Sequence, residues 1–260
     1  MIAMTAEEVR ELAARLDEAA LAGAPIPQVA SQAGIDAATA YAVQEALIER
    51  RLARGERLVG LKMGLTSRAK MAQVGVDEVI WGRLTDGMRV PDGGVVDLAG
   101  YIHPRAEPEI AFLMARAPEP GEPPAAFAEA VRAVAPALEL IDSRYADFRF
   151  QLADVIADNT SAAGFAIGSW QPVPPDLEDL AVTLEVNGEV AETGSTAAIL
   201  GDPRLSLEEG LRLAGRAGVR VREGWVFLAG AATAAVPLTP GSRVRASVER
   251  LGSVTLGTAP

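Results

Sequence analysis

The chain has 260 residues, 49% of them hydrophobic, with no cysteine and one histidine. This composition excludes disulfide frameworks, Cys/His zinc sites and thiolate nucleophiles, so a catalytic metal would need mainly oxygen ligands, as Mg²⁺ or Mn²⁺ prefers. The formal net charge is −11, its acidic residues are spread along the chain, and no basic stripe is present, which argues against a nucleic-acid partner.

The N-terminal residues have no basic segment followed by an apolar one, and no apolar run is long enough to cross a bilayer. We therefore expect a cytoplasmic protein that does not interact with a membrane.

Two helices are predicted at the start of the chain. Thr5 and Glu8 have capping-box spacing, and Gly23 ends the apolar period that follows. Asp36 is expected to cap a second helix that runs through about Arg54. We expect residues 1–56 to form a small helical cap and residues 57–260 to form the catalytic domain.

Short β-type segments separated by Gly, Pro and Asp dominate the remainder. Strands are predicted at Leu58–Met63, Val95–Leu98, Pro108–Met114, Ala137–Ile141, Val182–Val186, Val226–Leu228 and Val244–Val248. Because strands and helices do not alternate strictly, the predicted fold class is α+β.

Four local features complete this prediction. Asn187-Gly188 is typical of a hairpin turn, and the Pro-rich stretch Ala117–Pro124 is typical of an exposed loop. A helix is expected at Ala125–Val134, and another is expected to begin at Ser206, with Glu209 completing a capping box.

The most conspicuous group of candidate functional residues is acidic. Glu107 and Glu109 are two residues apart on a predicted strand and therefore share a face, while Glu139 lies within an apolar strand, where an unpaired carboxylate is costly to bury. Convergence of the three on a divalent cation would remove that cost. The alternative is two solvent-facing glutamates and a Glu139 paired with an arginine such as Arg144.

Three further residues are ambiguous. Lys62 lies in an apolar, Gly-rich segment, where burial would lower its pKa and suit acid/base chemistry, but it could equally extend its ammonium group to solvent. Thr233 is the one polar side chain of Ala229–Pro237, which is either a pocket wall or a core strand. His103 precedes a proline and is interpreted as a turn residue rather than a catalytic base.

Several blocks, in order, resemble the 2-keto-4-pentenoate hydratase / 4-oxalocrotonate decarboxylase family of the fumarylacetoacetate hydrolase-like superfamily. These blocks are Gly60–Leu84, Ile102–Phe112, Ala137–Phe150, Val155–Ser161 and Ala229–Leu238. The resemblance covers nearly the whole chain. It implies a rolled, mixed β-sheet catalytic domain of fumarylacetoacetate hydrolase type with a helical N-terminal part.

The resemblance also implies site residues. Glu107, Glu109 and Glu139 match the family's Mg²⁺ (or Mn²⁺) ligands, Lys62 matches its active-site lysine, and Ser161 matches a substrate-binding serine, although Thr160 stands where relatives often have alanine. Together with Thr233, Ser161 is expected to bind substrate. The implied partners are a small 2-oxo acid, other copies of this chain in a homo-oligomer, and the hydratase of the same pathway.

Two branches of the family differ in reaction. Tyr145, Phe148 and Phe150 follow the pattern of the decarboxylase branch, as does the A-T-A-A run ending at Ala235. We therefore expect metal-dependent decarboxylation of 2-oxo-3-hexenedioate in the meta-cleavage degradation of aromatic compounds. The alternative is the hydratase, which adds water to 2-hydroxypenta-2,4-dienoate.

Overall fold

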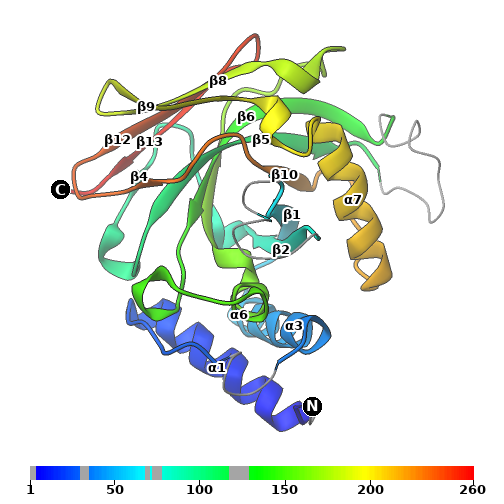
Figure 1. The fold of residues 1–260 in the computed structure, drawn as a ribbon, viewed down its shortest axis with the longest axis vertical. Helices are drawn as coiled ribbons and strands as arrows, with labels where there is room; N and C mark the ends of the chain where they lie inside the picture. Colours follow the sequence, from blue (N-terminus) through cyan, green and yellow to red (C-terminus); the bar gives the residue numbers. More distant parts are fainter. Residues whose placement is uncertain (1–3, 30–34, 68–70, 72–77, 117–128) are drawn as a thin grey trace.

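The structure is a computed structural model that describes residues 4–29, 35–67, 71, 78–116 and 129–260. The N-terminal helices lie at one end, a curled sheet with one further helix beside it occupies the middle, and a second sheet covers the other end (Figure 1). The α+β prediction is therefore confirmed, including the rolled mixed sheet and the N-terminal helices.

The N-terminal helices begin and end where their capping residues predict. Helix α1 (Ala6–Ala22) has the capping box of Thr5 and Glu8 and ends at Gly23 in the left-handed conformation. Helix α3 (Ala37–Ala53) is capped by Asp36. Both pack with α6 (Leu152–Ala157) in one hydrophobic cluster. The division at residues 56 and 57 stays a prediction.

The curled sheet has the strand order β2-β1-β10-β5-β6-β7-β3, and β11 pairs with β5. Its strands are β1 (Leu58–Gly64), β2 (Ile80–Thr85), β3 (Arg89–Val90), β5 (Arg105–Met114), β6 (Val131–Ile141), β7 (Ala162–Ile167), β10 (Val226–Ala231) and β11 (Val236–Pro237). The pairs β1–β10 and β3–β7 are parallel and the other pairs are antiparallel, so the sheet is mixed.

The second sheet has the order β4-β13-β12-β8-β9. Its strands are β4 (Val95–Val96), β8 (Ala181–Val186), β9 (Glu189–Ser195), β12 (Arg243–Val248) and β13 (Gly252–Thr258). Asn187 and Gly188 both have positive φ between β8 and β9, which confirms the predicted hairpin.

Successive side chains of β6 face opposite sides of the curled sheet. Leu138 and Leu140 pack toward the second sheet, whereas Ala135 and Ala137 belong to a cluster with Phe165 inside the curled sheet. Every second residue of β5 and β6 therefore faces the concave interior.

Two helix predictions differ in part from the structure. Residues Val131–Val134 belong to β6 rather than to a helix, because they pair with β5, while 117–128 lie outside the described residues. Helix α7 (Pro203–Arg216) begins earlier than predicted, with Asp202 as its cap. Ser206 is instead buried within α7 and donates a hydrogen bond to the carbonyl of Ala229.

The predicted strands do not include β2, β3, β7, β11 or β13. Among the described residues, no helix is long and apolar enough to cross a membrane.

Candidate metal centre

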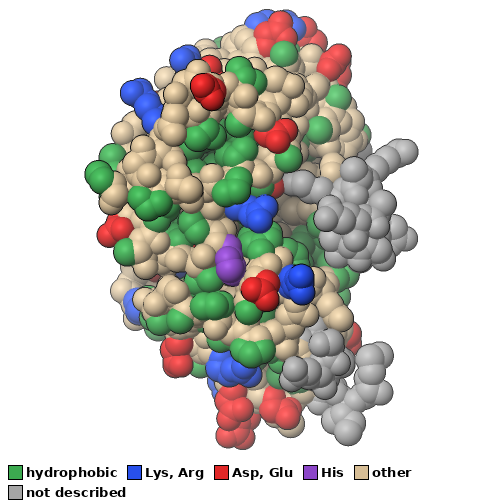
Figure 2. Space-filling model, turned by 60° about the vertical axis from the view of Figure 1, so that its left-hand side comes forward, with side chains coloured by type: hydrophobic (Ala, Val, Ile, Leu, Met, Phe, Trp, Pro, Cys, Tyr) green, Lys and Arg blue, Asp and Glu red, His purple; other side chains and the backbone are tan. Residues whose placement is uncertain are grey.

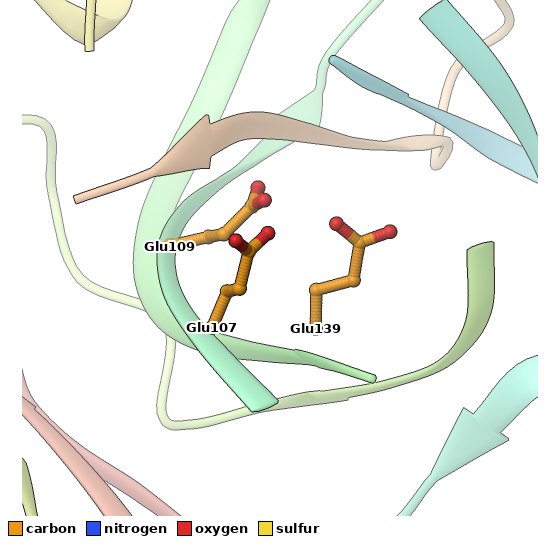
Figure 3. A group of neighbouring side chains, drawn as sticks. All are labelled: Glu107, Glu109 and Glu139. Atoms are coloured by element: carbon orange, nitrogen blue, oxygen red, sulfur yellow. The ribbon is translucent and has the colours of Figure 1, made fainter. Parts of the chain in front are cut away.

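The three glutamates meet on the concave face of the β5–β6 pair. Glu107 lies directly opposite Glu139 in the antiparallel register, and Glu109 lies opposite Ala137. Because residues two apart on a strand share a face, Glu107 and Glu109 both point toward the side chain of Glu139 (Figure 3). Of the two interpretations of this acidic group, convergence is the correct one.

The three carboxylates are close together and buried. One carboxylate oxygen from each glutamate lies within 4.8 Å of the others, and all three side chains are buried. Glu139 is 0% exposed and Glu109 is 1% exposed. Carboxylates held this close repel each other strongly in a medium of low dielectric constant, so a cation is needed to stabilise their ionised forms.

Lys62 supplies one positive charge. Its Nζ lies 2.9 Å from Oε2 of Glu139 and donates a hydrogen bond of 3.0 Å to the carbonyl oxygen of Thr160. Glu139 therefore pairs with Lys62 and not with Arg144, which instead pairs with the buried Asp158. Lys62 is 3% exposed, so the alternative in which its ammonium group reaches solvent is wrong.

The charges of the cluster shift each other's pKa. Burial opposes the charged form of Lys62, but Glu139 and the other two glutamates outweigh burial and raise the pKa of the ammonium group. The lowered pKa predicted for Lys62 is thus wrong, because desolvation is not the only influence. Burial raises the pKa of Glu109 well above its ordinary value, and the charge of Glu139 raises it further.

A strained loop supports Lys62. Asn159, Thr160 and Ser161 all have positive φ, a conformation that costs non-glycine residues energy. The side chain of Asn159 compensates by pairing with both backbone groups of Arg83, at 2.8 and 2.9 Å, and Thr160 Oγ1 donates to the carbonyl of Trp81 at 2.9 Å. The loop therefore offers Lys62 a fixed carbonyl acceptor.

Two glycines allow this close packing. A Cβ at Gly64 would lie 2.5 Å from Cγ2 of Thr160, and one at Gly230 would lie 2.1 Å from Oγ1 of Thr66. Gly230 also donates a backbone hydrogen bond of 2.8 Å to Oε2 of Glu109. Sequence reasoning did not single out Asn159, Gly64 or Gly230 for these roles, because each depends on contacts distant in the chain.

The predicted substrate-binding residues lie differently. Ser161 is 4% exposed, and no hydrogen-bond partner of its Oγ is found in the described part of the chain. Thr233 lies between Ala232, whose N–H donates to the carbonyl of Pro108, and β11, but its hydroxyl donates to the carbonyl of Ala234. Substrate binding by Ser161 and Thr233 stays a prediction.

His103 lies before β5, outside the glutamate cluster. Its backbone N–H donates a hydrogen bond to the carboxylate of Asp142, and its ring contacts Phe148 edge-on. Its place in the connection leading to β5 agrees with the interpretation as a turn residue.

The donor set fits a hard divalent cation. All three candidate ligands are carboxylates, and Oε1 of Glu109 and Oε1 of Glu139 are buried without a hydrogen-bond partner in the described structure. Lys62 neutralises only one of three potential negative charges, so a divalent cation would complete the compensation. Oxygen donors of this kind suit Mg²⁺ or Mn²⁺.

Comparison with protein families agrees with this geometry. The family model of the fumarylacetoacetate (FAA) hydrolase C-terminal region matches residues 65–257. The chain belongs to the fumarylacetoacetate hydrolase family. Within this family, it is 49% identical over 251 residues to a 4-oxalocrotonate decarboxylase of Pseudomonas sp., a match that covers 96% of this chain and 98% of that protein.

A solved structure gives a matching result. The 4-oxalocrotonate decarboxylase of Pseudomonas putida G7, complexed with magnesium and adipate, superposes with a TM-score of 0.93 at 40% identity, covering 98% of each chain. Hydratases of the same family are also similar. For example, the 2-keto-4-pentenoate hydratase of Burkholderia vietnamiensis (strain G4 / LMG 22486) is 38% identical over 256 residues, covering 95% of each chain.

Proposed function

We propose that this fumarylacetoacetate hydrolase family member is a Mg²⁺-dependent decarboxylase that converts 4-oxalocrotonate (2-oxo-3-hexenedioate) to 2-hydroxypenta-2,4-dienoate and CO₂ in the meta-cleavage pathway. The observation that carries the proposal is the greater identity to a decarboxylase, 49%, than to the hydratase described above, 38%. The buried carboxylate cluster supports a divalent cation, with Mn²⁺ as the alternative to Mg²⁺.

The reaction cleaves the bond between C5 and C6. The electron pair of that bond moves through the C3=C4 double bond to the 2-oxo oxygen, CO₂ leaves, and a proton completes the enol. Bound at the carboxylates, Mg²⁺ supplies Lewis-acid stabilisation of the negative charge that develops on the oxygen. Glu107, Glu109 and Glu139 are the residues that would hold it.

Lys62 is the proposed catalytic residue of the chain. Contacts with Glu139 and with the Thr160 carbonyl hold its Nζ in place, and its raised pKa keeps it protonated at neutral pH. A fixed ammonium group beside the carboxylates can orient the 2-oxo acid or deliver the proton to the enolate oxygen. Ser161 and Thr233 are proposed to contact the substrate.

The decisive test offers both family substrates to the purified protein with Mg²⁺. We expect CO₂ release from 2-oxo-3-hexenedioate, and its loss after EDTA treatment with recovery on adding Mg²⁺. Formation of 4-hydroxy-2-oxopentanoate from 2-hydroxypenta-2,4-dienoate without CO₂ release from the first substrate would instead establish the hydratase. Full decarboxylation after exhaustive chelation would refute the metal-dependent mechanism.

Three further properties are proposed from the family resemblance alone. They are assembly into a homo-oligomer, association with the pathway hydratase, and a cytoplasmic location. Sedimentation of the purified protein, alone and mixed with the hydratase, tests the first two.

A further inference from the structure

Arg105, the first residue of β5, shares the concave face with the glutamates. In the β5–β6 register Arg105 lies opposite Ile141, and the next pair on the same face joins Glu107 to Glu139. Two residues along an antiparallel strand correspond to about 6.8 Å. Arg105 therefore lies two residues before Glu107 on the same face of β5, next to the carboxylate cluster.

The guanidinium group of Arg105 has no acidic partner in the described part of the chain. Its Cζ lies 4.4 Å from the ring centroid of Phe148. Other buried or half-buried arginines differ, because Arg144 pairs with Asp158 and Arg51 pairs with Glu56. Stacking on an aromatic face leaves the planar edge of a guanidinium free for two parallel hydrogen bonds to a carboxylate.

Phe148 is held firmly in this position. Both Asp147 and Phe148 have positive φ, which is unusual for a bulky side chain. The Phe148 ring packs edge-on against His103 at 6.1 Å and against Phe150 at 5.4 Å between centroids. Figure 2 shows one face of the molecule, on which Lys and Arg side chains lie among hydrophobic ones. His103 and Phe148 are both half-buried, so this aromatic group lies near the solvent boundary. Strain that persists at such a position is typical of functional sites.

We propose that Arg105 binds the distal carboxylate of a dicarboxylic 2-oxo acid whose other end occupies the glutamate cluster. The proposal rests on the function proposed above and assigns the residue that selects a dicarboxylate. An extended six-carbon chain with C–C bonds of about 1.5 Å spans roughly 6 Å between its end carbons. That length is close to the rise of two residues along β5, which separates the backbone positions of Arg105 and Glu107.

The chemistry determines which kinetic constant Arg105 affects. The distal carboxylate becomes neutral CO₂ during the reaction, so its ion pair with Arg105 is strong in the bound substrate and weakens in the transition state. An interaction of this kind lowers KM and does not raise kcat, because part of it is lost on the way to the transition state. Arg105 is thus a specificity residue, distinct in role from Lys62.

The test measures binding and kinetics in the presence of Mg²⁺. Titration calorimetry compares adipate, a saturated six-carbon dicarboxylate, with hexanoate, which lacks the second carboxylate. We expect the wild-type protein to prefer adipate by at least tenfold. Arg105→Met should weaken adipate about 10- to 100-fold, as expected for loss of charged hydrogen bonds, and leave hexanoate unchanged.

Arg222→Met provides the matched control. Arg222 precedes Trp225, which pairs with Met114 at the opposite end of β5, so this variant removes the same charge far from the proposed contact. It should keep the adipate preference. Arg105→Met should also raise KM for 2-oxo-3-hexenedioate, and kcat should not fall. An adipate preference that survives in Arg105→Met, with circular dichroism showing the native fold, would overturn the proposal.

Two measurements keep the proposal testable if Arg105→Met does not fold. Arg105→Lys keeps the charge without the planar edge and should lose part of the preference, and wild-type protein should bind monomethyl adipate at least tenfold more weakly than adipate. Equal binding of these two ligands would overturn the proposal. A failure of the proposed decarboxylase function is distinguishable from a failure of the Arg105 proposal. In the first case the wild-type protein would not release CO₂, whether or not adipate binding depends on Arg105.

Discussion

Replacing Glu109 with glutamine should separate metal binding from folding. The substitution should keep or raise the stability of the metal-free protein and should weaken Mg²⁺ binding. The variant keeps the side-chain shape and an oxygen that can accept the hydrogen bond from Gly230 N–H. It removes one negative charge from a site in which three buried carboxylates face one buried ammonium group. The new amide can donate to Glu139, whose carboxylate lies in the same cluster.

The effect on stability is measured on the metal-free proteins. The pKa of Glu109 is raised in the folded state, because burial and the charge of Glu139 disfavour its ionised form. A carboxyl with a raised folded pKa contributes stability at low pH, and that contribution is lost as the pH rises through the raised value. Once the pH exceeds that raised value, the wild-type protein has lost it. Glu109→Gln does not titrate, so its metal-free melting temperature should equal or exceed that of the wild-type protein.

Adding Mg²⁺ should reverse the order. At a free concentration 100 times the wild-type Kd, binding stabilises the folded wild-type protein by about 2.7 kcal/mol, or roughly 5–10 °C in a chain of this size. A variant whose Kd is 100-fold weaker gains only about 0.4 kcal/mol at the same concentration, or roughly 1–2 °C.

Differential scanning fluorimetry with and without EDTA measures both effects. The exposed Glu189 on β9 supplies the control, since Glu189→Gln removes a charge from the other sheet and should keep the full Mg²⁺ response. If metal-free Glu109→Gln melts several degrees below the wild-type protein and still responds fully to Mg²⁺, the glutamates serve the fold and the metal interpretation is refuted.

Three further predictions follow from neighbouring contacts. Lys62→Met should lower kcat by at least about 100-fold, as expected for loss of a group that positions or protonates substrate, while calorimetry still detects Mg²⁺ binding; an unchanged kcat would make Lys62 structural. Arg144→Met leaves the buried Asp158 unpaired and should lower the free energy of unfolding by about 3–5 kcal/mol in urea titrations, whereas a loss below 1 kcal/mol would contradict a strong buried pair. Gly64→Ala places a methyl group against Thr160 and should cost about 1–3 kcal/mol of stability and reduce kcat, and normal turnover would show that the loop shifts without consequence.

Local signals in the sequence predicted the fold where one short segment decides the structure. The capping box of Thr5 and Glu8 places α1 to the residue, and Asn187 with Gly188 places the β8–β9 hairpin. The sequence predicts a helix that extends through Val134, whereas pairing with β5 makes Val131–Val134 part of a strand. Ser206 matched a capping pattern but lies inside α7, since Asp202 offers an earlier cap.

The candidate site divides in the same way. The spacing on β5 predicts that Glu107 and Glu109 share one face. That Glu107 lies opposite Glu139 depends on the register between β5 and β6, which cannot be deduced from one sequence. The pKa of Lys62 was predicted in the wrong direction for a related reason. Its shift depends on three carboxylates that come from distant segments, and only the folded arrangement brings their charges together.

The left-handed loop also determines when during folding the site can form. Its anchors are far apart in the chain: Asn159 pairs with Arg83 across 76 residues, and Thr160 accepts from Lys62 across 98. Closing such long loops is entropically costly, and contacts of this sequence separation form slowly. The helices and the β5–β6 pairing can be complete while the strained loop is still open. After dilution from denaturant, enzyme activity should therefore return more slowly than the far-ultraviolet circular dichroism signal.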